Sequence, residues 1–242
     1  PQSPHLEDMT WTEVAAALEA GVTTVIVPTG GTEQNGPHMI LGKHNYIVRQ
    51  ASGEIAARLG DTLVAPVISY VPEGNTGDHP SGHMRWPGTL SLPEPVFEDL
   101  LEHTARSLAT HGFTRILFIG DSLGNQWAQA RVARRLTKEW ADSGVLVLHV
   151  GDYYDANGQK AALLQDGYSV AQIGQHAGLR DTSELLYVAP NGIRATPVAP
   201  PPGADAGYDG APGLATAELG RRLLELKIEA ALLQIRTALG QG

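Results

Sequence analysis

One glycine-rich stretch of the sequence brings a carboxylate and two imidazoles within twelve residues of one another. Residues 32–38 read Thr-Glu-Gln-Asn-Gly-Pro-His, and residues 41–44 read Leu-Gly-Lys-His. Carboxylate and imidazole groups coordinate metal ions and transfer protons, which are the two tasks of a hydrolytic site. Glu33 and His44 are therefore the first candidates for such chemistry.

A buried strand is expected to position Glu33. The run Val22–Val27 is rich in β-branched residues, and the Pro-Thr-Gly-Gly sequence of residues 28–31 ends it. Glu33 then follows the carboxyl end of a strand, where open α/β sheets bind ligands. The alternative is that Glu33 only accepts backbone N–H bonds from its own loop.

Two further polar segments could join the same site. The loop 73–89 contains His83 and Trp86, and a loop of this length in a compact domain is typically functional. Gly120–Gln126 follows the predicted strand Ile116–Ile119 directly. Because the carboxyl ends of parallel strands meet at one edge of a sheet, this segment should lie near the first one.

A fourth segment, residues 174–184, supplies His176. Its pKa near neutrality suits the transfer of a proton to a leaving amine, although a histidine that only supports its loop is the competing interpretation. Asp181 and Ser183 in the same segment are candidate caps of a short helix.

The elements that must position these residues alternate along the chain. The runs typical of strands are Val22–Val27, Leu63–Val67, Ile116–Ile119 and Val145–Val150. The helical patterns are Trp11–Ala20 with a capping box at Thr10, Tyr46–Leu59, Val96–His111, Gln126–Ser143 and Leu214–Leu239. The alternation predicts a largely parallel sheet with helices on both faces, in a single domain of residues 1–242.

Composition excludes several classes of function. The 242 residues are 42% hydrophobic and carry a net charge of −9, which favours one globular core and argues against a nucleic-acid or anionic-membrane partner. The absence of cysteine excludes thiolate ligands, and no apolar run is long enough to span a bilayer. The sequence starts at Pro1, so we expect a cytoplasmic protein or an exported one whose leader has been removed.

Five motifs, in order along nearly the whole chain, resemble the creatininase (creatinine amidohydrolase) family. They are Glu33–His38, Leu41–His44, His83–Thr89, Gly120–Asn125 and His176–Ser183. The resemblance implies a three-layer α/β/α sandwich, a dinuclear Zn or Mn centre that opens or cleaves small amides, and a homo-oligomer, typically a hexamer.

The departures from the family pattern concern its metal ligands. Glu33 is retained, but Asn35, His44 and Ser122 stand where the family has His, Asp and His. Asp181 stands where the family has Glu. A branch of the family shares the Asn and Lys-His substitutions yet keeps the imidazole at the position of Ser122. We therefore expect at most one divalent ion.

That ion, Zn or Mn, would be held by Glu33, His44 and Asp181, with water or Asp121 completing the shell. No metal at all is the alternative if the change at Ser122 abolished binding.

The predicted catalytic residues are Glu33, His176 and Ser122. Ser122 would be a nucleophile only in a relay with His176 and Asp181, because its context is not the Gly-x-Ser-x-Gly of a nucleophile elbow. The predicted substrate-binding residues are His38, Asn35, His83, Trp86, Asp121 and Asn125.

The predicted function is hydrolysis of a non-peptide amide C–N bond, open or cyclic, in a small molecule. A metal ion or Glu33 would polarise the attacking water, and His176 would protonate the leaving nitrogen. The alternatives are a metal-independent cyclase, lyase or dehydratase of specialised metabolism, and a non-catalytic small-molecule binder.

Overall fold

The computed structural model describes residues 3–240 and contains one sheet of four parallel strands. The strands are β1 (Thr24–Thr29), β2 (Thr62–Val64), β3 (Arg115–Gly120) and β4 (Leu146–His149), in the order β2-β1-β3-β4. In the central pair, Thr24 lies opposite Arg115 and Thr29 lies opposite Gly120. The four predicted strands are confirmed, with small differences at their ends.

Helices precede, connect and follow these strands. The longer ones are α1 (Trp11–Glu19), α2 (Lys43–Leu59), α3 (Glu94–Thr110), α4 (Leu123–Glu139) and α8 (Ala217–Ala238). The shorter ones are α5 (Gln159–Gln165), α6 (Val170–Ile173) and α7 (Leu179–Val188). Within residues 3–240, no helix combines the length and the apolar character needed to cross a bilayer.

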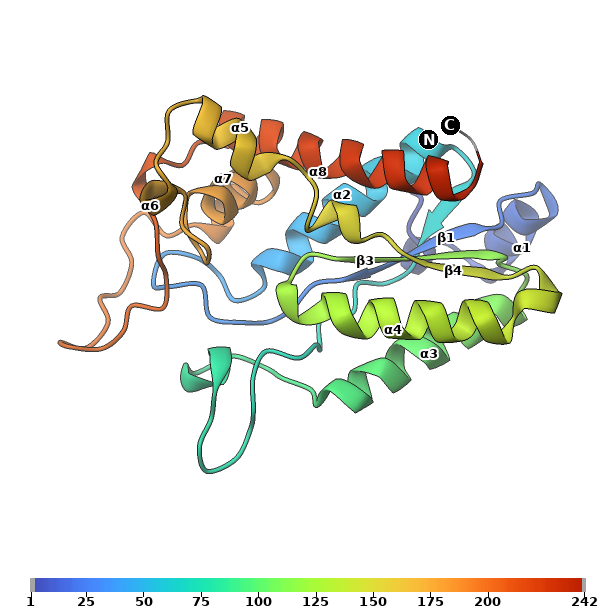
Figure 1. Cartoon of the computed structure of the whole chain (residues 1–242), viewed down its shortest axis with the longest axis horizontal. Coiled ribbons are helices and arrows are strands. Elements are labelled where there is room, and N and C mark those ends of the chain that lie inside the picture. Colours follow the sequence, from blue (N-terminus) through green and yellow to red (C-terminus); the bar gives the residue numbers. More distant parts are fainter. Residues whose placement is uncertain (1–2, 241–242) are drawn as a thin grey trace.

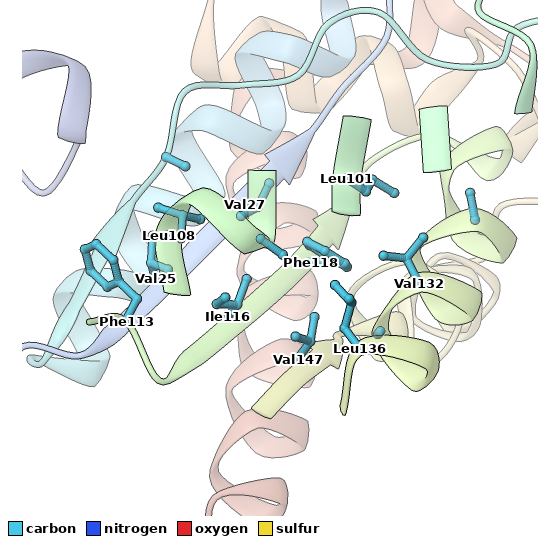
Figure 2. Close-up of a cluster of buried hydrophobic side chains, with 14 of the residues drawn as sticks. Val25, Val27, Leu101, Leu108, Phe113, Ile116, Phe118, Val132, Leu136 and Val147 are labelled. Atoms are coloured by element: carbon cyan, nitrogen blue, oxygen red, sulfur yellow. The ribbon is translucent and has the colours of Figure 1, made fainter. Parts of the chain in front are cut away.

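The sheet lies between two helical layers, with α3 and α4 on one face and α2 and α8 on the other (Figure 1). The alternation of side chains along β1 explains this. Val25 and Val27 pack with α3 and α4, as Figure 2 shows, whereas Ile26 packs with α2 and α8. Both faces are apolar, as a doubly covered parallel sheet requires, and the three-layer α/β/α sandwich is confirmed.

Local signals fix the N-terminal end of α1 but not that of α7. The predicted capping box is present, because Thr10 accepts the N–H of Glu13 and the Glu13 carboxylate accepts the N–H of Thr10. In contrast, Asp181 and Ser183 do not cap α7, because the helix begins earlier with Gly178 at its N-cap. Both residues lie inside the helix.

Candidate active site

A cavity of about 320 Å³ lies at the carboxyl ends of β1 and β3. Glu33 reaches it from the loop after β1, Ser122 follows β3, His44 belongs to the first turn of α2, and Asp181 belongs to α7. All four residues that the sequence analysis expected to combine in a metal or nucleophilic site therefore line one cavity. Asp121, His83 and His176 line it too.

His44 connects the two carboxylates that follow β1 and β3. Its Nε2 lies 2.8 Å from Oε1 of Glu33, and its Nδ1 lies 2.7 Å from Oδ2 of Asp121. Burial and the charge of Lys43 lower the pKa of His44, but the two carboxylates outweigh them and raise it to about 9. His44 is therefore an imidazolium at neutral pH and donates to both carboxylates.

Lys43 is the second cation beside Glu33. Its side chain is 1% exposed, and its Nζ lies 2.7 Å from Oδ2 of Asp181 and 3.5 Å from Oε1 of Glu33. Asp181 also accepts the backbone N–H of Ala177 at 2.7 Å. Burial raises the pKa of Glu33, but the charges of His44 and Lys43 hold it well below its ordinary value. Glu33 is thus a buried, ionised carboxylate.

Lys227, from α8, is the corresponding cation on the other side of the cavity. Its side chain is 7% exposed, and its Nζ lies 2.7 Å from Oδ1 of Asp121 and 3.1 Å from Oε2 of Glu184. The hydroxyl of Tyr153 donates to Oδ1 of Asp121 at 2.8 Å, and the amide of Gln159 donates to Oε1 of Glu184 at 2.6 Å. This network leaves neither carboxylate unpaired.

Gln34 contacts both neighbouring imidazoles, those of His83 and His176. Its Oε1 accepts the N–H of Gly36, so its amide nitrogen donates to Nδ1 of His83 at 3.1 Å. The proton of His83 then sits on Nε2, which lies 3.2 Å from Oε2 of Glu33. The backbone carbonyl of Gln34 accepts from Nε2 of His176 at 2.9 Å. The amide nitrogen of Gln34 also lies 3.1 Å from this Nε2, but a carbonyl oxygen can only accept, so the shorter contact assigns the proton to Nε2. With the proton there, Nδ1 of His176 presents its lone pair 3.7 Å from Oε1 of Glu33.

The loop that carries His176 is held by Asp209, whose Oδ1 accepts the backbone N–H groups of Gln175 and His176 at 2.7 Å each. Burial and the charge of Lys43 lower the pKa of His176 to about 4, against the opposing charge of Glu33. His176 is therefore a neutral imidazole at pH 7.

Glu73 lies behind Glu33 and was not among the predicted site residues. Burial and the negative charge of Glu33 raise the pKa of Glu73 to about 9, so this carboxyl group carries a proton at neutral pH. A Cβ added at Gly31 would lie only 2.4 Å from Oε1 of Glu73. Because residue 31 is a glycine, the carboxyl group of Glu73 can lie close to Glu33.

The predicted nucleophilic relay is not assembled. Ser122 lines the cavity, but none of the hydrogen bonds within residues 3–240 joins its hydroxyl to an imidazole. The carboxylate of Asp181 bonds to Lys43 and to the N–H of Ala177 instead of to His176. Ser122 is the N-cap residue of α4 without a side-chain cap bond.

Four predicted substrate-binding residues lie outside this cavity. Asn35 donates to the carbonyls of Glu33 and Ile40, and Asn125 donates to Thr29 and to the carbonyl of Gly30, so both fix the loops of the site. The placement of these two buried amides does not support contact with a substrate.

The other two lie nearer the surface. His38 contacts the carbonyl of Ala177 through Nε2 at 3.1 Å and packs against Tyr208. Trp86 lines a neighbouring cavity together with His83, and its indole N–H donates to the carbonyl of Asp205 at 3.3 Å. These two side chains shape the surroundings of the site.

The donor set at Glu33, His44 and Asp181 does not fit the divalent ion predicted there. A coordinating imidazole must offer a lone pair, yet both nitrogens of His44 face carboxylates. The ammonium of Lys43 contacts both Glu33 and Asp181. A metal ion at this position would have to displace that ammonium.

A second set of donors has suitable spacing. Among the described residues, Glu33, His83 and His176 form the group whose ligand atoms all lie within 4.8 Å of one another. When the Gln34 amide donates to Nδ1 of His83, Nε2 of His83 carries an N–H toward Glu33. An ion held by all three groups would require His83 to present the lone pair of Nε2 instead, with the amide of Gln34 turned over.

Sequence reasoning missed the two lysines. Lys43 stands next to His44 in the motif Leu41–His44, and this position could have marked it as a site residue. Lys227 lies in α8 among charged residues at helical spacing and is separated from Asp121 by 106 positions. No local pattern marks it, because only the docking of α8 brings it to the site.

Comparisons with known proteins identify the family and the fold. A family model described as Creatininase: Creatinine amidohydrolase matches residues 7–234. The mycofactocin precursor peptide peptidase of Mycolicibacterium smegmatis is 31% identical over 187 residues, which are 75% of this chain and 64% of that protein. The chain thus spans less than two thirds of that relative's length. The creatinine amidohydrolase of Pseudomonas putida is 25% identical over 198 residues, with 78% and 74% coverage.

Solved structures show the same fold. A crystal structure of creatinine amidohydrolase (creatininase) superposes with a TM-score of 0.76 at 23% identity and covers 98% of both chains. Creatininase structures described as a Mn form and as a mutant of Zn-Zn type give TM-scores of 0.75 and 0.76 at 24% identity. With the match to the family model over most of the chain, these findings establish that this chain belongs to the creatininase family.

Proposed function

We propose that this protein hydrolyses an amide C–N bond of a small molecule in the cavity beside Glu33. The observation that carries the proposal is the placement of His176, whose Nδ1 lies 3.7 Å from Oε1 of Glu33 while its Nε2 lies 2.9 Å from the carbonyl of Gln34. A neutral imidazole next to a buried carboxylate can accept a proton from water. Membership of the creatininase family and the names of its relatives, a peptidase and an amidohydrolase, support the reaction class.

In the proposed mechanism, a water molecule lies between His176 and the amide carbonyl of the substrate. Nδ1 of His176 accepts one of its protons while the oxygen forms a bond to the carbonyl carbon. The resulting imidazolium lies beside the Glu33 carboxylate, which stabilises it. His176 then returns the proton to the leaving nitrogen as the C–N bond breaks, so that a carboxylic acid and an amine are released. The low pKa of His176, about 4, provides the base form needed to start.

The cavity supports a small substrate. Its volume of about 320 Å³ is at the lower end of the usual range for ligand sites, roughly 300–1,000 Å³. Such a volume suits a cyclic amide or the end of a short peptide better than an extended chain. No step uses a metal ion, because Lys43 contacts Glu33 and Asp181 in the first donor set and the second set would require a change of tautomer at His83. A single Zn or Mn ion is the alternative.

The test is turnover of a panel of cyclic and open small amides in water enriched in ¹⁸O, followed by mass spectrometry. We expect one solvent oxygen in the acid product. Replacement of a proton-transfer residue costs about 10²–10⁴-fold in rate, so His176→Asn and Glu33→Gln should lose activity to that extent. The exposed Lys138→Met serves as the matched control. Equal turnover by His176→Asn and the wild type would refute the assignment.

The same experiment separates the second candidate function, a cyclase, lyase or dehydratase. The contacts of Lys43 with Glu33 and Asp181 favour this candidate, because without a metal ion the activation of water depends on His176 alone. A product formed without solvent oxygen would support it. Binding of the panel without any turnover would instead identify a non-catalytic binder.

A further inference from the structure

We propose that the ammonium groups of Lys43 and Lys227 supply the positive charge that divalent ions would otherwise supply to this acidic site, which makes it a metal-free centre. Each lysine lies between two carboxylates at the carboxyl edge of the sheet. Both side chains are buried, with 1% exposure for Lys43 and 7% for Lys227. Lysine side chains are almost never fully buried unless they are paired, as both are here.

Lys227 neutralises the side of the cavity formed by β3 and α7. Its Nζ contacts Asp121 at 2.7 Å and Glu184 at 3.1 Å, and the other oxygen of Asp121 bonds to His44 at 2.7 Å. These carboxylates would be suitable oxygen ligands for a divalent ion if they were free. Here each of them already accepts a hydrogen bond from a buried cation.

Lys43 neutralises the opposite side and borders the space for substrate. Its Nζ contacts Asp181 at 2.7 Å and Glu33 at 3.5 Å, and Lys43 lines the same cavity as His176. An ammonium has three N–H groups, so one can point to a third acceptor. If the proposed hydrolysis is correct, this acceptor is the carbonyl oxygen of the substrate, which becomes negatively charged during attack.

Charge balance then disfavours a metal ion. The carboxylates of Glu33, Asp121, Asp181 and Glu184 each contact Lys43, Lys227 or His44. A divalent ion would add two positive charges close to cations that already satisfy these oxygens. Binding would require an ammonium to be expelled from a buried position.

The first test measures metal content and thermal stability of the wild-type protein without any substrate. The protein is incubated with excess Zn²⁺ or Mn²⁺, desalted and analysed by plasma emission spectroscopy. We expect less than about one tenth of an equivalent, and a Tm that EDTA or metal changes by no more than about 1 °C. A bound ion at ~100 times its Kd would raise Tm by about 5–10 °C. One tightly held equivalent with such a shift would overturn the proposal.

The second test removes one ammonium. Lys43→Met frees the carboxylates of Glu33 and Asp181, so this variant should gain Zn²⁺ binding and a Zn²⁺-dependent rise in Tm. The exposed Lys138→Met should behave as the wild type does. If Lys43→Met folds poorly, Lys43→Gln keeps a polar side chain without the charge. Folded variants that bind Zn²⁺ no better than Lys138→Met would contradict the role given to Lys43.

Activity provides a separate result. Turnover by the wild type, if found, should be unchanged after dialysis against EDTA, and loss of turnover restored by Zn²⁺ or Mn²⁺ would overturn the inference. Absence of turnover on every amide would count against the proposed function alone. The metal content and the Tm of the two lysine variants decide the present inference in either case.

Discussion

Replacement of Lys227 by methionine tests the charge network most directly. The substitution keeps the apolar stem but removes the ammonium that contacts Asp121 and Glu184 at 2.7 and 3.1 Å. Two neighbouring carboxylates then remain buried without this partner. Breaking a buried ion pair from one side typically costs about 3–5 kcal/mol. For a chain of this size, each kcal/mol corresponds to about 2–4 °C, so Tm should fall by about 6–20 °C.

The loss of stability should depend on pH. In the native protein, burial raises the pKa of Asp121, but the charges of Lys227 and His44 outweigh burial and hold it below its ordinary value. The stabilisation by ionised Asp121 is fully present above about pH 4, which is the pKa of an aspartate in the unfolded chain. It is lost as the pH falls through the lower pKa of Asp121 in the folded protein. Without Lys227 the pKa values of Asp121 and Glu184 rise. In acid these groups then become protonated, and the unpaired buried charges that destabilise the variant are removed. Its deficit should be larger at pH 8 than at pH 5.5.

Urea unfolding of the wild type, Lys227→Met and the exposed control Lys138→Met at both pH values measures these differences. The double variant Lys227→Met/Glu184→Gln should recover part of the stability, since one unpaired carboxylate is removed. A loss below about 1 kcal/mol, or a loss independent of pH, would show that Lys227 does not hold this network together.

Further predictions concern activity and assembly. Ser122→Ala should retain turnover within about tenfold, because its hydroxyl lacks an imidazole partner; a loss of several orders of magnitude would restore the nucleophile hypothesis. The rate should fall below pH 4, where His176 becomes protonated. It should also fall above pH 9, where His44 loses its proton and no longer donates to Glu33. A pH profile without these limits would contradict the roles given to His176 and His44. Arg180 lines the cavity without a hydrogen bond or ion pair to the described residues, so Arg180→Ala should raise KM for substrates with a carboxylate more than for neutral ones. Light scattering should give a mass above the 25.7 kDa of the single chain, as a homo-oligomer requires.

The sequence was sufficient to predict the sheet and the edge at which the candidate site lies. Runs such as Ile116–Ile119 are apolar and β-branched, and the glycine-rich segments after them end the strands, so local chemistry determines these elements. The short helices α5 and α6 were not predicted because they have too few turns to show a helical period. The caps of α7 were misassigned because Asp181 bonds to the N–H of Ala177 from inside the first turn.

The site was predictable in its position but not in its electrostatics. Glu33 and Asp121 follow strands, and this alone placed them at one edge. Whether their charges meet a metal ion or an ammonium depends on which helix docks over them. Gln34 gave no signal for its contacts with His83 and His176, because these contacts depend on the approach of loops 82–86 and 174–178.

The distance along the chain between Asp121 and Lys227 has a consequence for synthesis on the ribosome. The two residues are 106 positions apart, and Lys227 belongs to α8, the last helix of the described part. While the earlier strands emerge, Asp121 and Glu184 have no ammonium partner. The ion pairs of Lys227 with these two carboxylates can form only after α8 has been made and has docked. Pairing of the charges at this edge of the sheet is therefore later than synthesis of the strands themselves.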